Sequence, residues 1–98
     1  MYRRYDFLVS DGDGGGSYKF LIECDGDWFH AKKYVEGVIP KSKLTYTQKK
    51  NVLNDSKKTR IAKELGIPLL RFWEEDILKN FQKVKTSIKN EIKRQTSN

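Results

Sequence analysis

Several residue types and segments are scarce in this sequence, and each scarcity excludes a class of protein. Cys24 is the only cysteine, so no intramolecular disulfide can form and a zinc site built from several thiolates is ruled out. No apolar run approaches the ~20 residues that cross a bilayer, and the mixed basic and aromatic start is unlike a secretion signal. We therefore expect a cytoplasmic protein with no membrane partner.

Positive charge, by contrast, is abundant. Lysine and arginine number 20 and aspartate and glutamate 13, which gives a formal net charge of +7 on 98 residues. Such a surplus on a short chain favours a polyanionic partner, although lysines that only keep a protein in solution would produce the same total. The length allows one domain, residues 1–98, with one modest core.

The first quarter of the chain predicts a β-hairpin. Residues 2–9 and 18–25 are rich in aromatic and β-branched side chains, which is typical of strands. The glycine-rich segment 10–17 between them predicts a flexible connecting loop.

The remainder predicts helices around a further strand. We expect a short helix near 29–35, a helix over 48–65, a buried strand over 67–73 and a last helix over 74–94. The last helix follows from an apolar stripe at steps of three and four residues, formed by Ile77, Phe81, Val84, Ile88 and Ile92. The predicted fold class is α/β, with a mixed central β-sheet flanked by helices.

Acidic side chains gather at the end of the second predicted strand. Glu23 and Asp25 are two residues apart in LIECD, so both point to one face. A symmetric hairpin with Val9 opposite Tyr18 would add Asp6 to that face. Three carboxylates this close repel one another unless a cation lies between them, and their oxygens suit Mg²⁺ or Mn²⁺. The pattern therefore predicts a metal site.

The same register leaves another interpretation open. It places Asp6 opposite Leu21 and Arg4 opposite Glu23, so that Arg4 could neutralise Glu23 at a solvated edge with no metal. The opposite face would be an apolar surface for a helix to cover, formed by Tyr5, Phe7, Val9, Tyr18, Phe20 and Ile22.

The single histidine, His30, follows the acidic strand in DGDWFH. An imidazole can accept a proton from water near neutral pH, which makes His30 a candidate general base, although a lone histidine is more often structural. Trp28 and Phe29 precede it. Two adjacent aromatic residues can fill a core or form a wedge or stacking platform for DNA bases.

Asp55 is predicted to point toward the body of the protein from the helix over 48–65. A buried acid on a helix usually holds a histidine, an arginine or a metal-bound water, and the alternative is that Asp55 caps a later helix start. The opposite half of this helix and the segment 32–43 are basic and could contact phosphates. The candidate contacts are Lys32, Lys33, Lys57 and Arg60.

Three segments together resemble a known family. They are YDFLV around Asp6, IECDGDWFH, and NVLNDSKKTRIAKELGIPLLRFWE. This pattern resembles the very-short-patch repair endonucleases and their homing-endonuclease relatives, the "EDxHD" branch of the PD-(D/E)XK nuclease superfamily. The similarity covers residues 5–77. Its last segment is the most specific, because an Asn-Val pair, an aspartate, Glu-Leu-Gly and Trp-Glu occur in the family's order.

The resemblance implies a role for each matching residue. Asp6 matches the metal-binding aspartate, and Cys24 matches a position whose backbone carbonyl reaches the metal. Asp25 matches a variable position that is histidine in the repair enzymes. His30 matches the histidine thought to activate water, and Asp55 matches the aspartate that supports it.

The resemblance also implies that Trp28 and Phe29 intercalate into DNA. Two departures stand out. The family's glutamate lies on a helix before the first strand, which this chain is expected to lack, and Asp25 replaces the lysine of the wider superfamily motif. The second departure shifts the role of base to His30. Because Asp25 also stands where the repair enzymes have a histidine, a homing-type or phage-type nuclease is favoured over mismatch repair.

We accordingly expect a magnesium-dependent endonuclease that hydrolyses double-stranded DNA in a bacterial or phage-infected cell, with Mn²⁺ as an alternative metal and no small-molecule cofactor. A dimer is one expectation for an oligomeric state that the sequence leaves open. The alternatives are a non-catalytic DNA-binding module, a mismatch-specific or structure-specific nicking nuclease, and an RNA-directed nuclease. The expected metal ligands are Asp6, Cys24 and Glu23, and the expected catalytic residues are His30, Asp25, Asp55 and Glu23.

Overall fold

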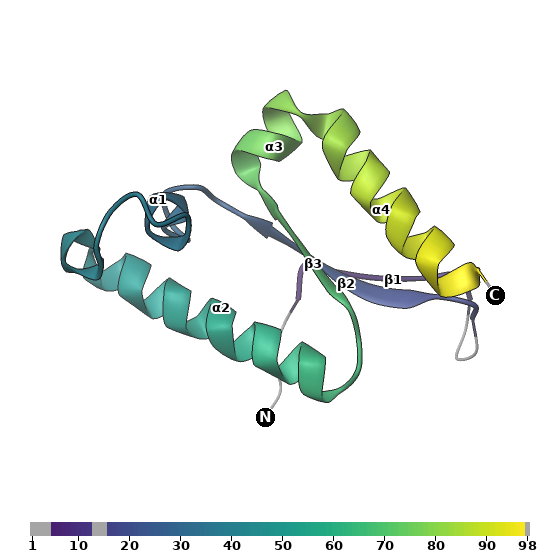
Figure 1. The fold of residues 1–98 in the computed structure, drawn as a ribbon. Helices are drawn as coiled ribbons and strands as arrows, with labels where there is room; N and C mark the ends of the chain where they lie inside the picture. Colours follow the sequence, from purple (N-terminus) through teal and green to yellow (C-terminus); the bar gives the residue numbers. More distant parts are fainter. Residues whose placement is uncertain (1–4, 13–15, 98) are drawn as a thin grey trace.

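A three-stranded mixed sheet forms the centre of the protein (Figure 1), in a computed structural model that describes residues 5–12 and 16–97. The strands are β1 (Phe7–Ser10), β2 (Lys19–Asp25) and β3 (Leu69–Trp73), in the order β1-β2-β3. β1 is antiparallel to β2, and β3 is parallel to it. The α/β class with a mixed sheet is thereby confirmed.

The hairpin register differs from the predicted one by two residues. Val9 lies opposite Phe20, and not Tyr18, while Leu21 pairs with Leu8 instead of Asp6. The reason lies in the loop, where the Asp11 carboxylate accepts a 2.9 Å hydrogen bond from the backbone N–H of Ser17 and keeps the residues before Lys19 out of the strand ladder. A shift of two residues preserves the faces. The predicted pairing of Arg4 lies outside the described residues.

Helix α2 (Tyr46–Glu64) begins two residues before the predicted start because Thr45 caps it. The Thr45 hydroxyl accepts the backbone N–H of Gln48, and the Gln48 side chain accepts that of Thr45, which satisfies two N–H groups at the helix start. Gly66, with φ +71°, ends the helix as expected. The adjacent Ile67 N–H then bonds to the Ala62 carbonyl.

The helix predicted over 74–94 is two helices, α3 (Glu74–Lys79) and α4 (Phe81–Thr96). The break is at Asn80, whose backbone adopts φ −131° and ψ 44° while its side chain bonds to Asp76. After this turn the chain changes direction (Figure 1), and α4 has Val84 buried and Phe81 exposed. The prediction of one continuous helix was therefore wrong, although its apolar stripe correctly marked Val84.

The other connections are short. Helix α1 (Lys32–Val35) is the core of the helix expected near 29–35, and a 3-10 turn (Lys41–Lys43) precedes α2. None of the described helices is both long and apolar enough to cross a membrane.

β2 is buried on both faces because α2 and α4 lie on opposite sides of the sheet (Figure 1). Leu21, Glu23 and Asp25 share the face toward α2, and Phe20 and Ile22 share the other. β3 was expected to be fully buried, yet all five of its residues are half-buried because it forms an edge of the described sheet.

Candidate active site

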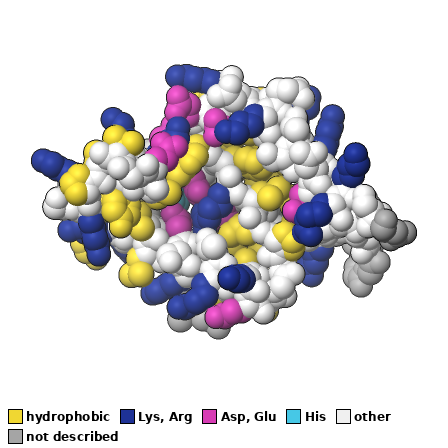
Figure 2. Space-filling view, viewed as in Figure 1, with side chains coloured by type: hydrophobic (Ala, Val, Ile, Leu, Met, Phe, Trp, Pro, Cys, Tyr) yellow, Lys and Arg dark blue, Asp and Glu magenta, His cyan; other side chains and the backbone are white. Residues whose placement is uncertain are grey.

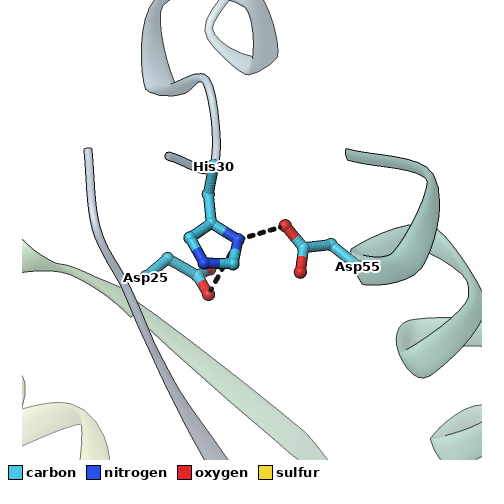
Figure 3. Close-up of side chains that lie close together, drawn as sticks. All are labelled: Asp25, His30 and Asp55. Carbon is cyan, nitrogen blue, oxygen red and sulfur yellow. Dashed lines mark hydrogen bonds and ion pairs between the residues drawn. The ribbon is translucent and has the colours of Figure 1, made fainter. Parts of the chain in front are cut away.

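Three of the predicted catalytic residues meet at the end of β2 (Figure 3). Asp25 is the last residue of β2, His30 lies in the turn before α1, and Asp55 lies in the middle of α2. The Nδ1 atom of His30 is 2.6 Å from Oδ2 of Asp55 and 3.8 Å from Oδ1 of Asp25. Since Asp55 lies far from either end of α2, the alternative that it caps a helix start is wrong.

The loop that carries His30 is held by its own backbone and by α2. The His30 N–H donates to the Gly26 carbonyl, while the Gln48 and Asn51 side chains of α2 donate to the carbonyls of Trp28 and Phe29 at 2.8 and 2.9 Å. α2 thus positions both the histidine loop and the aspartate that contacts the histidine.

The contact with Asp55 determines which nitrogen of His30 is basic. An ionised carboxylate only accepts hydrogen bonds, so a neutral imidazole must carry its proton on Nδ1 to make this contact. Nε2 then carries the lone pair, and no residue in 5–12 or 16–97 forms a hydrogen bond with it. The His30 side chain is 25% exposed, so the arrangement suits proton transfer at Nε2.

Arg71 is the member of the site that sequence reasoning missed. Its Nη1 lies 3.2 Å from both carboxylate oxygens of Asp25, and its Nη2 donates a 3.0 Å hydrogen bond to the Asp55 carbonyl. The signal was available, because Arg71 is the single charge within the apolar run IPLLRFW. A charge in such a strand needs a partner, and the unpaired acids at the end of β2 were the obvious candidates.

Asp25 is nearly fully buried, at 3% exposure. Burial raises the pKa of its carboxyl above the ordinary value, because the charged form loses water contacts, and the positive Arg71 guanidinium opposes this rise.

The predicted metal ligands Asp6, Cys24 and Glu23 are neighbours with protein partners. The Asp6 carboxylate accepts the Cys24 backbone N–H at 2.7 Å, and the Glu23 carboxylate accepts the Asp6 N–H at 3.0 Å. Glu23 is 3% exposed and also forms an ion pair with Lys58, at 3.3 Å. Burial and the surrounding acids raise the pKa of the Cys24 thiol.

Tyr5 lies on the opposite side from the one predicted. Its hydroxyl donates a 2.8 Å hydrogen bond to the Lys58 carbonyl in α2, so it belongs with the polar face and not with the apolar one. The ammonium of Lys58 lies 5.6 Å from the centre of the Tyr5 ring. Tyr5 precedes β1, so strand alternation does not govern its direction.

Trp28 and Phe29 are exposed at 54% and 58%, and their rings meet edge to face with centroids 5.0 Å apart. They therefore do not fill the core. Basic side chains lie around the face shown in Figure 2. Of the predicted phosphate contacts, Lys33 is exposed and Lys57 half-buried, whereas Lys32 pairs with Glu75 and Arg60 with Glu64.

No protein-family model matches this chain, and neither the curated proteins nor the solved structures contain a match to it. The functional assignment therefore depends on the chemistry of the site itself.

Proposed function

We propose that the protein is a metal-dependent DNA endonuclease of the homing or phage type, with a core related to the PD-(D/E)XK nucleases. One observation carries the proposal, namely the 2.6 Å contact between Asp55 and Nδ1 of His30, which presents Nε2 as a proton acceptor. The pair lies beside two exposed aromatic side chains on a chain of net charge +7. A general base suits phosphodiester hydrolysis, and a stacking surface with a surplus of cations suits binding of DNA.

In this proposal His30 Nε2 removes a proton from a water molecule. The water oxygen forms a bond to phosphorus, and the bond from phosphorus to one ester oxygen breaks. The leaving oxygen takes up a proton from solvent, so that the products are a phosphate monoester and a hydroxyl group. Asp55 stabilises the imidazolium that forms, because its carboxylate already contacts Nδ1. Asp25 is a weaker electrostatic partner of the same ring, at 3.8 Å.

The residues just before β1 and at the end of β2 fit Mg²⁺ or Mn²⁺ by the chemistry of their donors. Asp6 would hold the ion with its exposed carboxylate, joined by the backbone carbonyl of Cys24 and by Glu23 once Glu23 releases Lys58. A bound ion would neutralise charge on the phosphate.

Double-stranded DNA is the proposed substrate. Trp28 and Phe29 would stack against or between bases, and Lys33, Lys57 and the neighbouring cations would contact phosphates without reading sequence. A cytoplasmic location and a possible dimer remain predictions of the same proposal.

The test is cleavage of supercoiled plasmid with Mg²⁺, then with a chelator. Asp6→Asn is expected to abolish cleavage and leave the melting temperature unchanged, because Asp6 is exposed. Glu64→Gln is the matched control, an acid-to-amide change at a side chain that is 68% exposed on α2. Full cleavage by the Asp6→Asn variant would contradict the proposed metal site.

A non-catalytic DNA-binding module is the second candidate, and one observation favours it. Both buried acids already have cationic partners, Asp25 with Arg71 and Glu23 with Lys58, so the charges balance without a metal. This candidate predicts DNA binding that a chelator does not change, and no strand cleavage with either metal. Both candidates predict a log–log salt slope of roughly −0.9 per phosphate contacted.

A further inference from the structure

Arg71 links the two aspartates of the candidate active site. Besides its bonds to Asp25 and to the Asp55 carbonyl, its Nε donates to Thr59 Oγ1 at 3.3 Å, and its Nη1 lies 3.7 Å from Asp55 Oδ1. One side chain of β3 therefore joins the end of β2 to the middle of α2, next to His30.

These bonds hold Asp55 through both its backbone and its side chain. The Asp55 carbonyl accepts hydrogen bonds from Arg71 and from the Thr59 hydroxyl, the latter at 2.9 Å. The donors of a guanidinium point in fixed directions within one plane, so the contacts specify where this turn of α2 lies relative to β3. A lysine could supply the charge but not the set of bonds.

Arg71 already supplies a positive charge close to both carboxylates of the cluster. Ligand atoms of Asp25, His30 and Asp55 lie within 4.8 Å of one another, which by itself is compatible with a metal ion. The guanidinium nevertheless lies within 3.7 Å of both carboxylates. A divalent ion would have to displace a half-buried positive charge that makes several hydrogen bonds, which favours Arg71 as the resident cation.

We propose that Arg71 is a positioning residue that, through Asp55, keeps the proton of neutral His30 on Nδ1 and leaves Nε2 as the basic atom. Without Arg71, Asp25 and Asp55 would repel each other across the histidine, and Asp55 would lose its connection to β3. The imidazole would then have no fixed hydrogen-bond acceptor at Nδ1. The consequence for DNA cleavage rests on the proposed function, whereas the effect on the imidazole does not.

The first test measures which ring nitrogen of His30 carries the proton. His30 is the only histidine, so its ring ¹⁵N resonances are assigned without ambiguity. We would compare the parent, Asp25→Asn and the double variant Asp25→Asn/Arg71→Gln at a pH where the ring is neutral. The Asp25→Asn background keeps the double variant folded, because loss of Arg71 then leaves no buried acid unpaired. Arg60→Gln is the control, since Arg60 is exposed.

The parent, Asp25→Asn and Arg60→Gln are expected to show one dominant form with the proton on Nδ1. The double variant is expected to show a mixture of the Nδ1–H and Nε2–H forms. A double variant that keeps the Nδ1–H form would overturn the proposal, since Asp55 would then hold His30 unaided.

The second test reads catalysis with Arg71→Lys, which retains the charge. The single-turnover cleavage rate at saturating DNA is expected to fall roughly 10–100-fold, the usual effect of removing a group that orients a catalytic residue, while half-saturation by DNA stays unchanged. An unchanged rate would contradict a role in catalysis. The two proposals can fail separately. If the parent protein does not cleave DNA but the His30 proton moves when Arg71 is removed, the proposed endonuclease activity is wrong and the positioning role of Arg71 is retained.

Discussion

The two faces of β2 differ in chemistry although one strand supplies both. Toward α2 the strand presents Glu23 and Asp25, which are buried and each bonded to a basic side chain. Toward α4 it presents Phe20 and Ile22, which are apolar and buried. On the α2 face, removing charged groups from water lowers the stability of the fold, whereas on the α4 face the burial of apolar side chains raises it.

The comparison explains how so small a protein can hold a charged site. A chain of this length has one modest core, and alternation along β2 lets a single strand serve the core and the site together. Substitutions on the two faces should therefore have separable effects, on chemistry toward α2 and on stability toward α4.

The largest expected effect is on the α2 face. His30→Ala should lower the cleavage rate roughly 10²–10⁴-fold, the usual contribution of a general base, with little change in DNA affinity or melting temperature. The measurement is single-turnover cleavage at saturating DNA, with binding titrations and thermal melts in parallel.

Val84→Ala is the matched control for that experiment, because Val84 is buried in α4 on the other side of the sheet. It should lower the melting temperature and leave the rate unchanged well below melting. Lost DNA affinity with an undiminished rate in His30→Ala would make His30 a contact residue instead of a base.

The next effect is on stability, toward α4. Phe20 is 0% exposed and is the largest fully buried side chain of the described residues, so Phe20→Ala should cost about 3–5 kcal/mol of unfolding free energy. Phe7 shares this face through its pairing with Ile22 but is 57% exposed, so Phe7→Ala should cost much less. Chemical denaturation measures both, and equal losses would contradict the conclusion that Phe20, and not Phe7, is part of the buried core.

A smaller effect is expected at the exposed aromatic pair. Trp28→Ala should weaken DNA binding by about 1–3 kcal/mol, the usual contribution of stacking against a base, and should preserve the melting temperature. Binding titrations and thermal melts in parallel provide the measurement. A large fall in melting temperature with unchanged affinity would show that Trp28 supports the fold and does not contact DNA.

The smallest expected effect is a change of stability with pH, which should have opposite signs for acidic groups on the two sides of the sheet. Burial raises the pKa of Asp25, so its contribution to stability is present below the ordinary carboxyl range and is lost as pH rises through the raised pKa. The parent should therefore lose stability relative to Asp25→Asn as pH rises through that window.

Glu91 on α4 should behave in the opposite way. Its hydrogen bond with Arg94 lowers the pKa of the carboxyl, so its contribution is present above the ordinary range and is lost as pH falls through the lowered pKa. Denaturation of the parent, Asp25→Asn and Glu91→Gln across acid pH measures both signs. The same sign at both positions would contradict the role of burial at Asp25.

Local patterns in the sequence were enough to predict the elements and the faces of β2. Alternation placed Glu23 and Asp25 on one face, and that result survived a register error of two residues because the period of a strand is two. Helical periodicity correctly predicted that Asp55 points inward, and Gly66 marked the end of α2. These inferences depend only on the regular geometry of a strand or helix.

What depends on contacts between distant segments needed the tertiary structure. The break at Asn80 is a change of backbone conformation that the apolar spacing, which continues across it, does not encode. Asp25 found its partner in Arg71, 46 residues away, and Glu23 found Lys58, 35 residues away. Sequence shows that a buried charge needs a partner, but parallel pairing of β2 with β3 and the packing of α2 decide which residue it is.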